Sequence, residues 1–140
     1  MNRSPAHAAI GREFVWFMAI GVVGFLVDAA LFASLNSGYE WSIGAARAVS
    51  ASCSIVTTWA LNRRFTFAAR RSRRWRAELA RYAVGQGAGL IVNLGTFALI
   101  LRLAPSLRSA PIIALALGAT AALLFNFLTA RVLAFRPDAR

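Results

Sequence analysis

Long apolar runs alternate with short polar segments along most of the chain. Four such runs, at about residues 14–35, 43–61, 79–101 and 112–135, are rich in Ala, Leu, Ile, Val and Phe. At a rise of about 1.5 Å per residue, a helix of this length crosses a hydrocarbon core about 30 Å thick. The pattern therefore predicts an all-α integral membrane protein with four transmembrane helices.

The arginines divide unevenly between the two ends of these helices. One predicted side has only Arg47, Arg102 and Arg108. Because positively charged loops stay in the cytoplasm, the richer side is predicted to be cytoplasmic, with both termini and a basic loop at about residues 63–76. The arginines on that side are Arg3, Arg12, Arg63, Arg64, Arg70, Arg71, Arg73, Arg74, Arg76, Arg81, Arg131, Arg136 and Arg140.

Composition narrows the class of protein, and the partners that it can have, further. Hydrophobic residues make up 59% of the chain, more than a soluble domain carries, and the formal net charge is +11. A strongly basic chain suits nucleic acid or an anionic membrane surface. The arginines flank apolar segments and no separate soluble fold is visible, so we expect no nucleic-acid partner. The basic loop either fixes topology alone or also binds anionic phospholipids.

The second half of the chain resembles the first. The third run aligns with the first without a gap, and the second and fourth runs correspond near their ends. Both halves begin on the same side, so we expect two parallel-repeat helical hairpins within a single domain of residues 1–140. The matched pairs include Gly24 with Gly89, Asp28 with Asn93, Trp59 with Phe127, Arg63 with Arg131, and Phe67 with Phe135.

Several motifs resemble the GtrA-like family of small four-helix membrane proteins. The first run carries Gly21, Gly24 and Asp28 in a family-like spacing, and Leu61–Phe67 reads L-N-R-R-F-T-F, with Phe65 in place of the commoner tryptophan. The resemblance implies movement of a polyprenyl-phosphate-linked sugar across the bacterial cytoplasmic (inner) membrane. It also implies a role in cell-surface polysaccharide synthesis, with a membrane glycosyltransferase as a partner.

Two other functions stay open. The chain is also compatible with a non-transporting accessory subunit that anchors a membrane glycosyltransferase. A small-cation exporter with Asp28 as its proton and substrate site is the third hypothesis. Four helices are few to enclose a path, so a homodimer or hetero-complex is expected.

Polar residues inside the runs are candidate functional positions. Asp28 is the only acidic residue within a run, and a carboxylate there costs several kcal/mol unless it is protonated, paired or hydrated. Arg47 is a possible partner, in either a structural pair or a transport role. Asn62, Asn93 and Asn126 are expected to hydrogen-bond between helices.

Arg63, Arg64 and Arg131 lie where the second and fourth runs reach the cytoplasmic side. The planar guanidinium fork suits a phosphate, so these arginines either bind the lipid phosphate or anchor the helices at the interface. The sequence contains one cysteine and one histidine, and it has no set of a nucleophile and a base that is typical of catalysis. We expect no enzyme activity, cofactor or metal.

Overall fold

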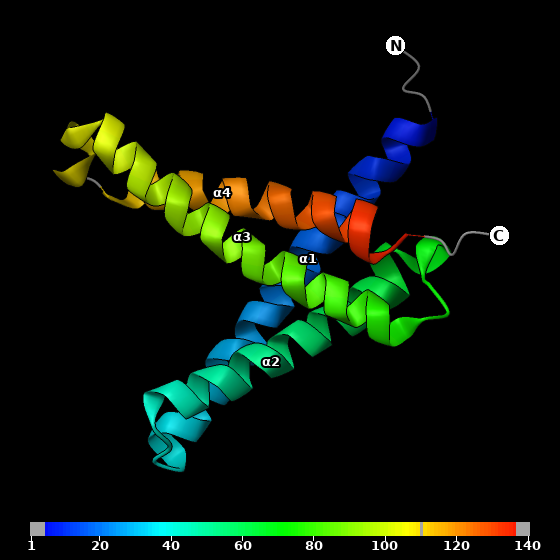
Figure 1. The fold of residues 1–140 in the computed structure, drawn as a ribbon, viewed down its shortest axis with the longest axis horizontal. Helices are drawn as coiled ribbons and strands as arrows, with labels where there is room; N and C mark the ends of the chain where they lie inside the picture. Colours follow the sequence, from blue (N-terminus) through cyan, green and yellow to red (C-terminus); the bar gives the residue numbers. More distant parts are fainter. Residues whose placement is uncertain (1–4, 110, 137–140) are drawn as a thin grey trace. The chain divides into compact units, whose positions relative to one another are not determined.

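The computed structural model of the chain describes residues 5–109 and 111–136. Within these residues the protein is helical and contains no strand. Arg3 and Arg140, which contributed to the predicted orientation, lie outside the described residues. The four long helices, drawn in Figure 1, are α1 (Pro5–Ala33), α2 (Ile43–Leu61), α3 (Trp75–Leu103) and α4 (Pro111–Thr129).

Short helical segments extend or connect these helices. Three π-helical turns continue α1, α2 and α4, each closed by a bond from a backbone N–H to the carbonyl five residues earlier, as from Phe67 N to Asn62 O (2.7 Å). The basic segment predicted as a loop from residue 63 is therefore still helical through Thr66. The short segments are η1 (Ser34–Gly38), η2 (Asn62–Thr66), η3 (Ala68–Arg70), η4 (Pro105–Ser109) and η5 (Ala130–Ala134).

Local sequence explains where two helices begin. Ser42 precedes α2, and its Oγ accepts a hydrogen bond from the Ala45 N–H (3.3 Å), which satisfies one unpaired donor of the first turn. Before α3, the Ser72 N–H donates to Glu78 Oε2 (2.7 Å), and the Arg74 N–H donates to Ser72 Oγ (2.9 Å). Side chains thus fix the backbone at the start of α2 and of α3.

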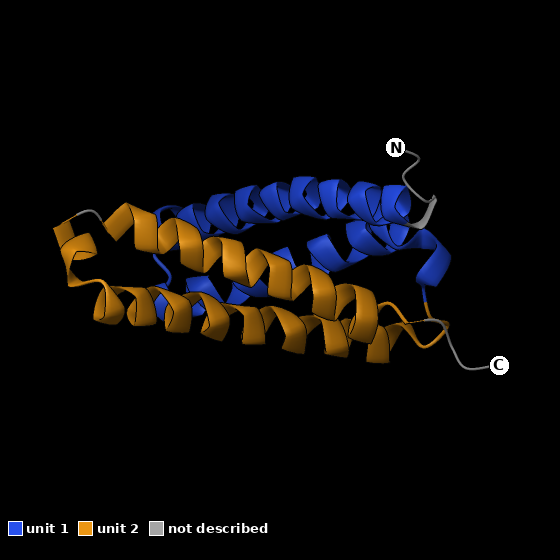
Figure 2. Ribbon diagram, turned by 90° about the horizontal axis from the view of Figure 1, so that it is seen from above, with its two compact units in different colours: residues 1–71 blue, residues 72–140 orange. Residues whose placement is uncertain are grey.

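The chain forms two compact units, residues 1–71 and 72–140, coloured separately in Figure 2. Each unit is a helical hairpin. In the first unit α1 packs against α2, and in the second α3 packs against α4. Each hairpin therefore has an internal helix interface of its own.

Three helical stretches are long and apolar enough to span a membrane: His7–Gly38, Trp75–Leu103 and Pro111–Ala134. The prediction of a multi-pass helical membrane protein is confirmed. α2 is not among the three stretches, because Arg47 and several hydroxyl side chains lower its hydropathy. A fourth crossing by α2 stays a prediction.

The two hairpins repeat the same plan of helix lengths. α1 and α3 both have 29 residues. α2 and α4 both have 19 residues, and a five-residue π-helical turn follows each. The repeat inferred from matched residues therefore extends to the bounds of α2 and α4 and of the turns after them, whereas α1 and α3 match in length but not in register.

Matched residues also make matched contacts. The Phe17 and Phe67 rings lie 6.3 Å apart in the first hairpin, and the corresponding Tyr82 and Phe135 rings lie 5.8 Å apart in the second. These two contacts join the first helix of each hairpin to the residue after its last π-helical turn. The internal repeat is therefore present in packing as well as in sequence.

Candidate functional site

A polar cluster joins α1 to α2. An Arg47 terminal nitrogen, Nη1, donates to Asp28 Oδ2 (2.5 Å), and the Ser50 hydroxyl donates to Asp28 Oδ1 (2.7 Å). The predicted pairing of Asp28 with Arg47 is thus present, and both carboxylate oxygens are engaged. Ser50 was not predicted, although its place one turn after Arg47 on the same helix face is the signal that would have identified it.

The cluster has a buried side and an exposed side. Ser50 is fully buried, and the Asp28 side chain is 17% exposed, whereas the Arg47 side chain is 59% exposed. The carboxylate therefore lies inside the helix pair, and the guanidinium covers it from outside. A carboxylate in this setting is stabilised by its cation and by the hydroxyl donor.

The same face of α2 stays polar farther along the helix. The Ser54 hydroxyl donates to the Gly24 carbonyl (2.8 Å), and Thr58 packs directly against Gly24. Arg47, Ser50, Ser54 and Thr58 recur at intervals of three or four residues, so they share one face of α2, and their contacts direct that face toward α1. The polar residues of α2 are therefore used within the hairpin.

The predicted asparagines have different surroundings. Asn62 is buried, and its Oδ1 accepts a hydrogen bond from the Thr66 hydroxyl (2.8 Å) within the same π-helical turn. In the second hairpin, Asn126 Oδ1 is buried against Gly89 of α3 and has no hydrogen-bond partner among the described residues. Interhelical hydrogen bonds from these asparagines stay a prediction.

The predicted phosphate-binding arginines belong to both units, Arg63 and Arg64 to the first and Arg131 to the second. The Arg63 guanidinium lies 5.7 Å from the centre of the Trp59 ring, and the Arg64 guanidinium lies 5.8 Å from that of Phe65. Arg131 belongs to the second hairpin, in η5. Arg64 instead lines a pocket of about 390 Å³ with Arg12 and with the chain as far as Arg70.

The second hairpin has an apolar groove of about 420 Å³ between α3 and α4. Gly85 and Ala88 of α3 lie in its wall, with Arg81 beside them and pointing one terminal nitrogen, Nη2, at the Ala134 carbonyl (3.3 Å). In the repeat, the residue that corresponds to Gly85 is Ile20, which is buried. A small residue thus leaves space in α3 where α1 has an isoleucine.

The side chains of the described residues include no group of three or more His, Cys, Asp or Glu that could hold a metal ion.

The family model for the GtrA/DPMS transmembrane domain matches residues 16–135. The chain belongs to this family. The match includes both hairpins, the Asp28 cluster and the segment L-N-R-R-F-T-F, so the resemblance found from the motifs is confirmed. GtrA membership implies involvement in the handling of polyprenyl-linked sugars, and GtrA proteins are generally small and non-catalytic. Comparison with curated proteins gives no significant match.

Proposed function

We propose that the protein translocates a polyprenyl-phosphate-linked sugar across the bacterial cytoplasmic membrane for cell-surface polysaccharide synthesis. The observation that carries this proposal is the Asp28–Arg47–Ser50 cluster inside a hairpin of a GtrA-family chain. A sugar head group is rich in hydroxyls, and it must cross a medium in which each unsatisfied polar group costs several kcal/mol. Polar groups inside the hairpin offer replacement hydrogen bonds on the way.

The cluster suits a neutral sugar better than an ion. When Arg47 leaves Asp28, the carboxylate accepts hydrogen bonds from sugar hydroxyls, and the guanidinium donates to others. The polyprenyl chain stays in the surrounding lipid throughout. Passage of the head group thus exchanges one set of hydrogen bonds for another.

A small-cation exporter fits this geometry less well. Both oxygens of the Asp28 carboxylate already have donors, and one of these donors carries a positive charge. A cation would have to displace Arg47 and compete with its charge. The cluster therefore favours the sugar lipid over a cation.

The proposal includes a topology and partners. We place both termini and the basic segment in the cytoplasm and α2 across the membrane as the fourth span, in a single domain. Anionic phospholipids would surround the basic segment, and a membrane glycosyltransferase would consume the translocated sugar. A homodimer would supply a wider path than one chain.

Replacing Asp28 tests the function directly. We expect Asp28→Asn to lower the rate of head-group translocation at least tenfold and to leave binding of the lipid phosphate nearly unchanged, because the phosphate does not approach a like charge. The measurement is flipping of undecaprenyl-phosphate hexose by purified protein in vesicles, with a binding titration in parallel. Ser52→Ala is the matched control, since Ser52 is exposed and its hydroxyl donates to Ala48 O of its own helix.

A wild-type flipping rate in Asp28→Asn would contradict this role of the carboxylate. Wild-type protein that binds the lipid without flipping it would instead favour the accessory-subunit function, which requires a glycosyltransferase but no transport.

A further inference from the structure

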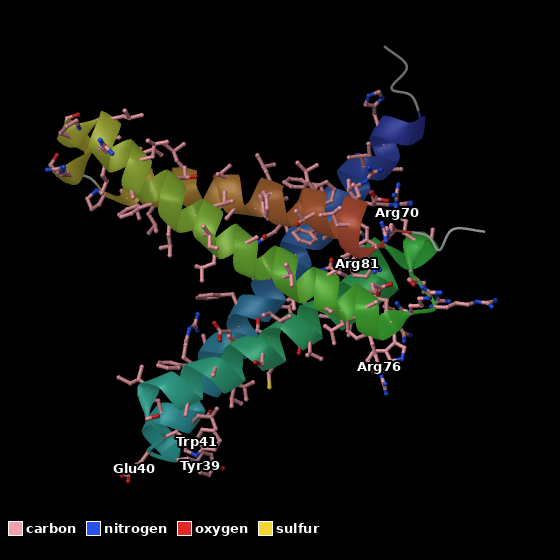
Figure 3. The ribbon with its side chains drawn as sticks, in the orientation of Figure 1. Tyr39, Glu40, Trp41, Arg70, Arg76 and Arg81 are labelled. Atoms are coloured by element: carbon pink, nitrogen blue, oxygen red, sulfur yellow. The ribbon has the colours of Figure 1, made fainter. Side chains whose placement is uncertain are left out.

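The 390 Å³ pocket of the first hairpin has walls of two kinds. Arg12, Glu13 and Trp16 of α1 form one wall, and the chain from Arg64 to Arg70 forms the other. Figure 3 shows Arg70 beside the N-terminal turns of α1. Every lining residue belongs to the first unit, so the pocket is a feature of this hairpin alone.

Aromatic rings hold one arginine in place. Trp16 and Phe65 stack with 5.8 Å between ring centroids and 16° between ring planes. The Arg64 guanidinium lies over the Phe65 ring, at 5.8 Å from its centre. Because a guanidinium over an aromatic face is attracted to it, the stack favours this position of the exposed Arg64 side chain, which lines the pocket.

The charge of the pocket suits an anion. Arg12, Arg64 and Arg70 contribute three positive charges and Glu13 one negative charge, which leaves a net charge of +2. Glu13 Oε1 lies 3.4 Å from Arg70 Nε, so this carboxylate orients the arginine through one of its five N–H donors. The terminal nitrogens of Arg70 are not used in that contact.

The size of the pocket limits the ligand. Small-molecule sites in proteins usually have volumes of about 300–1,000 Å³, and 390 Å³ lies near the lower end of that range. The pocket therefore has room for a phosphate with one attached sugar.

We propose that this pocket binds the phosphate of the polyprenyl carrier, with one sugar residue beside the Trp16–Phe65 stack. This inference rests on the proposed function and assigns the phosphate to Arg12, Arg64 and Arg70. Arg63 lies over Trp59 and is not among the lining residues, and Arg131 belongs to the other hairpin. Only Arg64 is common to this site and to the set predicted from the sequence.

The test is a binding titration of full-length protein in detergent with undecaprenyl monophosphate. We expect Arg12→Gln, Arg64→Gln and Arg70→Gln each to weaken binding about tenfold, because each removes a charge-assisted hydrogen bond. Arg76→Gln is the matched control, since Arg76 is an exposed arginine of the basic segment that lies over Trp75 and outside the pocket. Arg12 is an exposed residue of α1, so Arg12→Gln should fold normally, and a loss of binding in this variant reports on the pocket and not on folding.

Competition with other lipids distinguishes the phosphate of the polyprenyl carrier from that of a phospholipid. Neutral undecaprenol should not compete, and phosphatidylglycerol should compete at least tenfold more weakly than undecaprenyl monophosphate. Equal competition by phosphatidylglycerol would overturn the assignment to the carrier and identify a phospholipid head group as the ligand.

Wild-type binding in all three pocket variants, or an equal loss in Arg76→Gln, would overturn the pocket itself. Failure of the proposed function has a different signature, in which the pocket variants lose binding as expected while wild-type protein in vesicles flips no sugar lipid.

Discussion

The first and second hairpins share one plan, but they join their helices with different chemistry. In the first hairpin, Asp28 of α1 meets Arg47 and Ser50 of α2, so an ion pair and a hydroxyl fill the space between the helices. The contact depends on charge, and a positive side chain 59% exposed covers a mostly buried carboxylate.

The second hairpin has no charge at the matched positions. Asn93, Leu115 and Gly118 stand where the first hairpin has Asp28, Arg47 and Ser50. Gly118 lies so close to α3 that a Cβ added to it would be 2.8 Å from the Asn93 carbonyl oxygen and 2.9 Å from Asn93 Oδ1. Close packing of backbone replaces the ion pair.

This difference indicates a division of tasks after duplication. A charged cluster is costly in a membrane and is retained where it has a use, whereas a small residue lets two helices approach without polar groups. The first hairpin is therefore the better candidate for contact with the polar head group. The second hairpin has an apolar groove between α3 and α4 and no charge at the matched positions.

The largest effect on stability is expected when Gly118 of the second hairpin is replaced by serine, the residue at the matched position of the first hairpin, Ser50. Gly118→Ser should lower the free energy of unfolding by about 3 kcal/mol, because the new Cβ would collide with a backbone carbonyl that cannot rotate away. Thermal unfolding of purified protein in detergent measures the change.

Gly95→Ala is its control. Gly95 has no atom within 4 Å of an added Cβ, so this variant should be as stable as wild type or more stable by roughly 0.5–1 kcal/mol. A Gly118→Ser protein that unfolds at the wild-type temperature would mean that the two hairpins pack alike at this position.

A smaller effect is expected from the reverse exchange in the first hairpin. Arg47→Leu introduces the matched residue of the second hairpin and should cost about 1–2 kcal/mol, because Asp28 then keeps its charge without its cation. The double variant Asp28→Asn with Arg47→Leu should recover most of that loss. Additive losses in this double-mutant cycle would show that the ion pair contributes no coupling, and the contrast between the hairpins would then be one of shape alone.

The smallest effect concerns the turns. Glu40 has φ 53° in the connection of the first hairpin, and it is the one non-glycine residue with a positive φ in the described part of the chain. The connection of the second hairpin contains the 3-10 turn Pro105–Ser109 instead. Glu40→Gly should raise the free energy of unfolding by less than about 1 kcal/mol, because glycine adopts this conformation freely but loses more entropy on folding.

Glu40→Ala separates the two causes of such a change. It removes the carboxylate and keeps the Cβ, so its thermal unfolding should show no gain. An equal gain in both variants would show that the gain comes from the loss of the Glu40 charge and not from its backbone conformation.

The sequence predicted the features that depend on local pattern. Apolar runs gave the four helices, matched polar positions gave the repeat, and the isolated Asp28 pointed to Arg47. Helix bounds differed because apolar length reports the thickness of the hydrocarbon, while backbone hydrogen bonds continue into polar ends, as in α1 from Pro5. The pocket was missed because it forms where the chain turns back after Thr66, which brings Arg70 to Glu13.

The Asp28–Arg47 contact also bears on how the chain enters the bilayer. Arg47 is the fifth residue of α2, and α2 is too poor in apolar side chains to offset easily the cost of carrying an arginine into lipid. Once Arg47 is paired with a carboxylate of the preceding helix, much of that cost is removed. In the proposed topology, the unit whose transfer into lipid is favourable is then the hairpin rather than α2 alone, and α1 would still have to be within reach when the ribosome completes α2.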